Sequence, residues 1–112
     1  MSNDVACIAV TSDGQVSGGW GKTPAVAVAS VKDGSIVDWR VETVRWNELH
    51  DVGAEGAHHA RIVRFLLDND VTVVVAGHMG EPMQTTIGKL GVRVVLGVEG
   101  DARTAAQVAA QS

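Results

Sequence analysis

The sequence predicts an α/β fold in which helices cover both faces of a mixed five-stranded sheet. The run Val71–Ala76 is rich in β-branched residues, which is typical of a central parallel strand buried on both faces. Helical spacing of apolar residues precedes this run at Ala57–Asn69 and follows it up to Leu90. Asp33-Gly34 stands between two apolar runs and predicts a hairpin. Strands that alternate with helices indicate a parallel sheet, and the hairpin adds an antiparallel strand to it.

Each element has its own signal. The first strand is apolar without alternation, as in a sheet interior, whereas the third alternates, with Val37, Trp39 and Val41 on one face, as at an edge. Gly91 ends the second helix and Asp101 caps the last one. With connections of the usual hand, the sheet order is 3-2-1-4-5 with strand 2 antiparallel. The predicted strands are Val5–Val10, Ala25–Ala29, Ile36–Val41, Val71–Ala76 and Val92–Leu96, and Glu42–Gly56 is predicted to be a polar loop.

Composition limits the possible functions. We expect residues 1–112 to form a single domain with a core of its own, given 46% hydrophobic residues. The net charge is −4 and lysines and arginines do not cluster, so binding to nucleic acid or to anionic membranes is not expected. Cys7 is the single cysteine, which favours a reducing, cytoplasmic setting. Neither a secretory signal nor a membrane-spanning run is recognised.

Polar residues are expected to meet at one edge of the sheet. The carboxyl ends of parallel strands share that edge, and ligands of α/β proteins bind there. The edge should gather all four histidines as candidate metal ligands: His78, His58, His50 and His59. A glycine-rich loop, Asp13–Gly21, should close over a bound guest, because glycine allows close backbone approach. The candidate guest-binding residues are Asp13, Gly14, Gly18, Gly19, Gly77 and Met79.

The histidines also have structural interpretations. His59 lies centrally on the apolar stripe of its helix with Ile62, Val63, Leu66 and Leu67, as a core histidine bonded to backbone would. His58 flanks that stripe and should look toward the edge, whereas His50 also fits a solvated loop. Neighbours on a helix differ by about 100° around its axis, so His58 and His59 cannot both face one ion. The pattern therefore favours an open site, or a cluster that brings its other ligands.

Three other interpretations remain open. Asp13, Asp51 and Asp101 would suit a Mg²⁺-dependent hydrolase if they met, although each lies on a separate loop. Gly77–Gly80 at a helix start would suit a phosphate held by backbone N–H groups. Three tryptophans would favour a metal-free interaction or regulatory module if they formed an exposed patch: Trp20, Trp39 and Trp46.

Several segments resemble one known family in the same order along the chain. They are Ile8–Gly14, Val16–Gly21, Ala60–Leu66, Val73–Gly80 and Leu90–Val94, and they are similar to the NifX-like, dinitrogenase iron–molybdenum cofactor biosynthesis family. The resemblance implies a ribonuclease H-like, three-layer α/β/α fold. It implies a carrier without catalytic turnover, whose cargo is an iron–sulfur or iron–molybdenum type cluster or its precursor. A cofactor-assembly or acceptor protein would be its partner.

Overall fold

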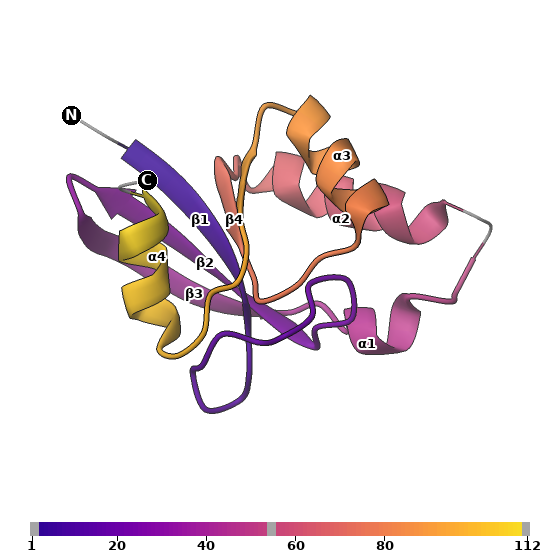
Figure 1. Ribbon diagram of the computed structural model, residues 1–112, viewed down its shortest axis with the longest axis horizontal. Coiled ribbons are helices and arrows are strands. Elements are labelled where there is room, and N and C mark those ends of the chain that lie inside the picture. Colours follow the sequence, from indigo (N-terminus) through magenta and orange to yellow (C-terminus); the bar gives the residue numbers. More distant parts are fainter. Residues whose placement is uncertain (1–2, 54–55, 111–112) are drawn as a thin grey trace.

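The computed structural model describes residues 3–53 and 56–110 as a five-stranded sheet flanked by helices (Figure 1). The strand order is β3-β2-β1-β4-β5, and β2 is antiparallel to both of its neighbours. The predicted order and direction of the strands are therefore confirmed. The elements are β1 (Asn3–Val10), β2 (Ala25–Lys32), β3 (Ser35–Thr43), α1 (Trp46–Leu49), α2 (Ala57–Asp68), β4 (Val73–Val75), α3 (Glu81–Lys89), β5 (Arg93–Val95) and α4 (Ala102–Ala110).

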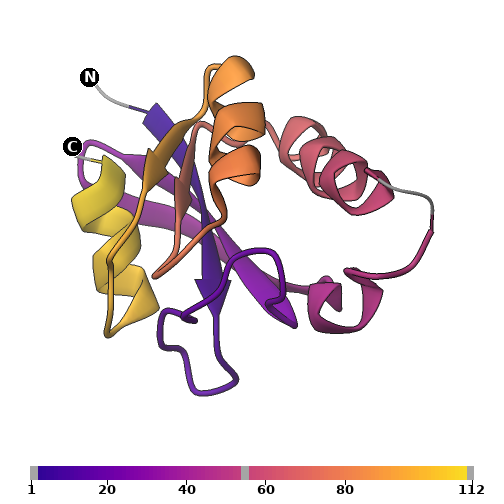
Figure 2. The same ribbon diagram turned by 45° about the vertical axis from the view of Figure 1, so that its right-hand side comes forward.

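The central strand β1 separates two apolar cores. It pairs with β4 in parallel, Cys7 opposite Val74, and its side chains alternate between the two faces of the sheet. Ile8 faces the core that α4 covers, whereas Cys7 faces the core beneath α2 and α3. Figure 2 shows α4 on one side of the sheet and α2 and α3 on the other. The three-layer arrangement follows from these two buried faces.

The hairpin between β2 and β3 has the predicted chemistry. Asp33 and Gly34 both have positive φ angles, 51° and 83°. A two-residue turn of this kind matches the twist of antiparallel strands, and asparagine, aspartate and glycine tolerate it best. The third strand is at the sheet edge as predicted. Of its predicted apolar face, Trp39 is half-buried beneath Arg103, whereas Val37 and Val41 are exposed.

The predicted loop Glu42–Gly56 is partly ordered into regular structure. Strand β3 extends to Thr43, and the one-turn helix α1 follows. Trp46 opens α1 and is 1% exposed, so burial of its ring fixes this turn against the core. The part of the predicted loop at Ala54 and Glu55 lies outside the described residues.

The buried stripe of α2 differs from the predicted one. Ile62 and Leu66 are buried as expected, but Leu67 is 56% exposed and Phe65 packs against the core instead. The stripe is thus rotated by part of a turn relative to the prediction. Arg61, on the side of α2 away from the predicted stripe, is half-buried because it faces α1.

The remaining helices begin and end as their sequences indicate. Pro82 lies in the first turn of α3, and Gly91, with φ of 81°, follows its end. Asp101 caps α4 through the backbone N–H of Thr104, at 2.9 Å. None of the helices in residues 3–53 and 56–110 is long and apolar enough to cross a bilayer.

Candidate functional site

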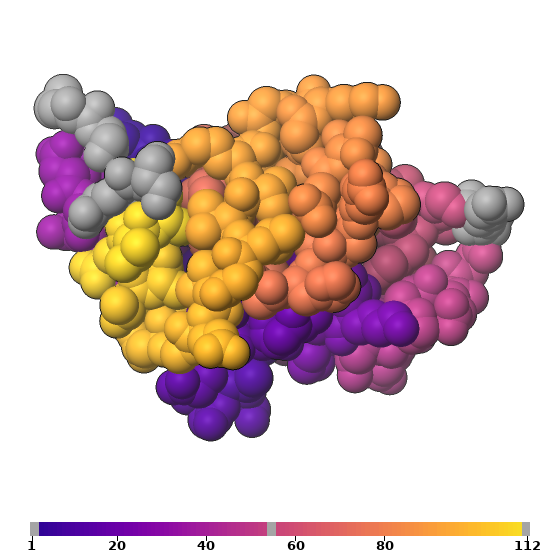
Figure 3. Space-filling view, in the orientation of Figure 1, coloured from indigo at the N-terminus to yellow at the C-terminus, as the bar shows by residue number. Residues whose placement is uncertain are grey.

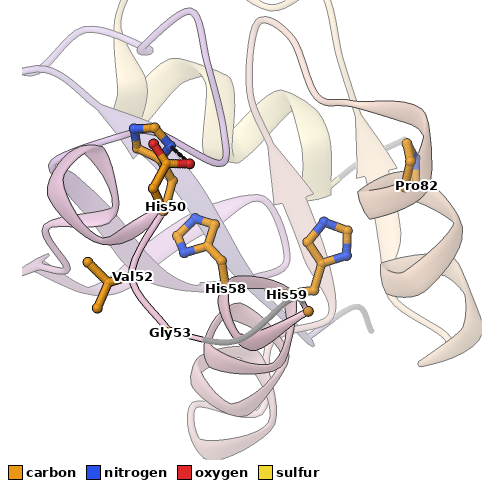
Figure 4. A pocket seen from close by; sticks show the side chains of 8 residues that line it. His50, Val52, Gly53, His58, His59 and Pro82 are labelled. Atoms are coloured by element: carbon orange, nitrogen blue, oxygen red, sulfur yellow. Dashed lines mark ion pairs between the residues drawn. The ribbon is translucent and has the colours of Figure 1, made fainter.

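Three of the four histidines line one pocket. His50, His58 and His59 surround a hollow of about 650 Å³ between the end of α1 and the starts of α2 and α3 (Figure 4). A smaller adjoining hollow of about 200 Å³ is lined by the same histidines and reaches inward to Trp20 and Met79. We call the two hollows together the histidine pocket. In the close-up, His58 lies between His50 and His59.

His58 is held by hydrogen bonds on both sides of its ring. Arg61 Nη1 lies 2.9 Å from His58 Nδ1, and a guanidinium can only donate, so Nδ1 is the acceptor. Nε2 then carries the proton and donates to the carbonyl of Gly21 at 2.7 Å. His58 therefore ties α2 to the loop after β1. It is free to ligate a guest only if one of these bonds is broken.

His50 and His59 have ring nitrogens that are less engaged. His50 Nδ1 is 3.3 Å from a carboxylate oxygen of Asp51, and Nε2 has no hydrogen-bond partner among the described residues. The half-buried His59 side chain makes no hydrogen bond within residues 3–53 and 56–110. The sequence had assigned the backbone-bonded role to His59, but His58 has it, because the buried stripe of α2 is rotated toward Ile62 and Phe65.

His78 lies apart from the other three. Its side chain is exposed, and it lines neither hollow of the histidine pocket. Its carbonyl accepts a hydrogen bond from the backbone N–H of Trp20 at 3.0 Å, and Gly19 bridges to it in parallel. This backbone pairing joins the loop after β1 to the β4–α3 turn, and the two segments lie against each other in Figure 3.

The predicted guest-binding glycines mostly contact other parts of the chain. A Cβ at Gly77 would lie 3.0 Å from the carbonyl oxygen of Gly18, so these two segments pack backbone to backbone. Gly18 and Gly77 line a separate hollow of about 450 Å³ beside Glu99. Gly14 accepts a backbone hydrogen bond from Ala102. The close approach expected of glycine is present, but it joins loop to loop.

Met79 and Asp13 have different environments. Met79 is 3% exposed and lines the inner hollow of the histidine pocket, next to Met83. Asp13 is exposed and accepts a hydrogen bond from the hydroxyl of Thr11. Of the predicted guest-binding residues, Met79 is therefore the one that the fold brings to the histidines.

The donor set suits a guest that brings ligands of its own. Within residues 3–53 and 56–110, no three histidine, cysteine or acidic side chains come together as a metal-binding group. Cys7 lies in the core, where burial raises the pKa of its thiol far above the ordinary value. Its thiolate is thus not accessible as a ligand, as expected of a packed small residue. The pocket supplies imidazole nitrogens and a thioether at an open face.

The carboxylates of the hydrolase interpretation are engaged separately. Asp51 lines the histidine pocket beside His50. The Asp101 carboxylate caps α4, where hydrogen bonds from the backbone N–H and the hydroxyl of Thr104 lower its pKa. Asp13 is paired with Thr11. Among the residues that the structure describes, there is no shared carboxylate site of the kind that two-metal hydrolysis needs.

Residues that the sequence did not point to support the histidine pocket from behind or line it. Trp20 and Trp46 are both 1% exposed, and their rings pack edge to face with centroids 5.2 Å apart. The three tryptophans therefore do not form the exposed patch that a metal-free interaction module would need. Arg61 donates to the carbonyl of Leu49 at 3.1 Å and so holds α1 against α2. In the sequence, the i, i+3 spacing of Trp46 and Leu49 could have indicated the helical turn α1.

The chain was also compared with known proteins. A family model described as "Dinitrogenase iron-molybdenum cofactor" matches residues 4–112. The crystal structure of PH0822 superposes with a TM-score of 0.75 at 17% identity, covering 96% of this chain and 88% of that one. The crystal structure of the protein mj0327 from Methanocaldococcus jannaschii gives 0.69 at 12% identity, covering 99% and 91%. At these identities the likeness shows the fold alone.

No curated protein matches the chain. The family match extends over almost the whole sequence, from the second residue of β1 to past the end of α4. It includes the segments that carried the resemblance and the residues that form the histidine pocket. The chain belongs to the dinitrogenase iron-molybdenum cofactor family.

Proposed function

We propose that this chain is a carrier that holds an iron–sulfur or iron–molybdenum type cluster, or a precursor of one, in the histidine pocket and passes it to another protein. The observation that carries the proposal is the convergence of His50, His58 and His59 on one pocket in a chain of this family. Imidazole nitrogens are suitable ligands for iron.

The engagement of each ring suggests how the cargo would be held. His50 Nε2 and the ring of His59 would ligate first, since neither would have to give up a hydrogen bond to another described segment. His58 would act mainly by keeping α2 against the loop after β1. His78 remains a predicted ligand, and it would join only if the cargo extended beyond the pocket.

Two imidazoles make a sparse protein shell, and a sparse shell suits a carrier. A cluster whose remaining positions are filled by its own sulfides needs few bonds from the protein, and few bonds must be broken when it leaves. The pocket is open, so a cofactor-assembly or acceptor protein would reach the cargo there. The proposal involves no catalytic turnover.

An anaerobic reconstitution tests the proposal. The purified protein is supplied with iron and sulfide, desalted, and examined by visible absorption and by metal content per chain. We expect a chromophore in constant ratio to protein. The double variant His50→Ala/His59→Ala should lose it, whereas Asp68→Asn, at the opposite end of α2, should keep it.

Two results would contradict the proposal. If the unaltered protein retains no iron, it is not a carrier of such clusters. If the chromophore disappears in His78→Ala but survives in the double variant, the cargo is bound outside the histidine pocket. Circular dichroism of each variant separates loss of binding from loss of fold.

The alternative functions have less support. The interaction module was based on an exposed tryptophan patch, but Trp20 and Trp46 are buried. The Mg²⁺-dependent hydrolase was based on the ribonuclease H-like fold that the family resemblance implies, and we keep that fold as a proposal. Fold alone does not specify an activity, and Asp13, Asp51 and Asp101 have separate partners.

A further inference from the structure

Strand β3 leaves one side of its backbone unpaired at the edge of the sheet. Val44, directly after β3, donates its N–H to the carbonyl of Pro24 at 3.0 Å, which continues the β2–β3 ladder. Hydrogen-bonding groups alternate in direction along an antiparallel strand, so those of Glu42 and Arg40 also face β2. The groups that face away from the sheet are those of Trp39, Val41 and Thr43. No other described segment bonds to them.

This edge has few of the features that block the addition of a further strand. Lysine, proline and bulges commonly protect sheet edges, and Ser35–Thr43 contains neither lysine nor proline. The register of β2 and β3 does shift at Val37, which is a bulge, but the shift precedes the free groups. Val41 is 56% exposed. Residues 39–43 are therefore regular strand with an open edge.

The charges on β3 make this edge complementary to itself. Arg40 and Glu42 share one face of the strand, with Arg40 Nε 2.9 Å from Glu42 Oε2, and both side chains are 45% exposed. In an antiparallel pair of two copies with Val41 opposite Val41, each Arg40 lies opposite Glu42 of the other copy. Opposite charges at directly opposed positions stabilise a strand pair. In the same register, Trp39 lies opposite Thr43.

The same charges disfavour the neighbouring registers. If Val41 were opposite Trp39 of the other copy, Arg40 would be opposite Arg40. If Val41 were opposite Thr43, Glu42 would be opposite Glu42. Like charges in opposed positions are destabilising. A further shift in the first direction brings the bulge into the paired run, and a further shift in the second extends past the end of β3. The register with Val41 on the axis is thus the favoured one.

We propose that two copies of this chain pair through β3, antiparallel and with Val41 opposite Val41, in a weak symmetric dimer with one continuous sheet. The two exposed Val41 side chains meet on the two-fold axis, as a self-complementary interface requires. The outward backbone groups of residues 39–43 all gain partners. So short a run buries little area, and the dimer therefore forms only at high concentration. Neither hollow of the histidine pocket includes a residue of β3, so this inference is independent of the proposed cargo.

Sedimentation equilibrium of the purified protein tests the dimer, from about 10 μM to about 1 mM, where weak complexes form. We expect the average mass to rise with concentration from that of one chain toward that of two. Val41→Lys should weaken association at least about tenfold, because two lysines would face each other across the axis. Leu67→Lys is the matched control, since Leu67 is also 56% exposed but lies on α2.

Two charge reversals test the register. Arg40→Glu places like charges opposite Glu42, and Glu42→Arg places like charges opposite Arg40, so each variant alone should stay monomeric. An equal mixture of the two variants should associate, because every opposed pair again has opposite charges. The two charges within each variant chain are alike. Recovery on mixing therefore cannot come from the internal pair of Arg40 with Glu42.

Four results would overturn the inference. They are an unaltered protein that stays monomeric at about 1 mM, equal association of Val41→Lys and Leu67→Lys, undiminished association of either charge variant alone, and no recovery on mixing. The first result would leave the edge of β3 to an extended segment of a different protein. Arg40 also donates to Asn69, so circular dichroism compares the fold of each variant with that of the unaltered protein.

Discussion

His58 and His59 are adjacent in the chain, yet their rings have different surroundings. His58 receives a hydrogen bond from Arg61 and donates one to Gly21, and its ring lies 6.4 Å from that of Trp46. His59 lines the same pocket without a hydrogen bond to any described residue. The first ring therefore joins three segments of the chain, whereas the second is available to a guest.

Replacing either histidine by alanine should therefore lower stability by different amounts. His58→Ala leaves the Gly21 carbonyl and one Arg61 donor unpaired in a half-buried setting, so the free energy of unfolding should fall by about 1–3 kcal/mol. His59→Ala removes no hydrogen bond to any residue that the structure describes, and it should cost less than about 1 kcal/mol. Urea unfolding of the two variants measures both values. Equal losses would mean that the His58 bonds do not contribute to stability.

At the scale of single residues, the sequence predicted which helices and loops carry the histidines, but not which hydrogen bonds each ring makes. The roles of His58 and His59 depend on how far α2 is rotated about its axis. That rotation is set by the packing of Phe65 against Trp46, with ring centroids 5.8 Å apart, which is a tertiary contact. The positions of Trp20 and Arg61 in the site depend on the same contacts. Spacing along one helix carries no information about them.

Short elements were harder to predict than long ones. Helix α1 has four residues, too few for a periodic pattern, and its stability comes from burying Trp46 and from Arg61 bonding to its last carbonyl. Strands β4 and β5 were predicted from their apolar runs but are shorter than those runs, three residues each. Helix α4, by contrast, begins at the predicted cap, since capping is a local interaction.

The cap of α4 should make the stability of the folded protein depend on pH. Hydrogen bonds from Thr104 hold the pKa of Asp101 below its ordinary value of 3.8 in the folded protein. The ionised carboxylate therefore stabilises the fold above that value, and the contribution is lost as the pH falls through the folded pKa. Asparagine can also cap a helix but carries no charge and does not titrate, so Asp101→Asn keeps a hydrogen-bond acceptor and removes the contribution of the ionised carboxylate.

Thermal unfolding of Asp101→Asn and the unaltered protein should reveal this contribution. We expect the melting temperature of the variant to be lower by a constant amount above about pH 5, and the gap to close below the ordinary value of 3.8. A gap that stays constant down to about pH 2 would show that Asp101 stabilises α4 without its charge.

The whole topology was predictable because it depends on patterns that extend over many residues. Buried β-branched runs, a hairpin signal and two helical stripes are sufficient to order five strands, and right-handed connections leave few alternatives. The sequence also predicted that all four histidines lie at one edge of the sheet, but it did not predict how that edge is divided into separate hollows. The fold divides that edge into a histidine pocket and a glycine-lined hollow, because the loop after β1 pairs with the β4–α3 turn between Gly19 and His78.

The pairing of these two loops joins the N-terminal and C-terminal halves of the molecule beside the histidine pocket. It depends on the absence of a side chain at Gly77. A Cβ at this position would lie 3.0 Å from the Gly18 oxygen and 3.1 Å from its Cα. Both are backbone atoms, so neither can rotate away, and the loop must move as a whole. Gly77→Ala should therefore lower the free energy of unfolding by about 1–3 kcal/mol and shift the amide NMR signals of the loop after β1.

Gly19→Ala is the matched control for this change. Gly19 lies in the same loop, has no positive φ, and a Cβ there would meet no atom within 4 Å. Its stability should stay within about 0.5 kcal/mol of the unaltered protein. If the two alanine variants unfold at the same urea concentration, the halves are not packed backbone to backbone at Gly77. If only Gly77→Ala is destabilised, the contact between the two halves positions the loop whose Trp20 and Gly21 complete the wall of the histidine pocket.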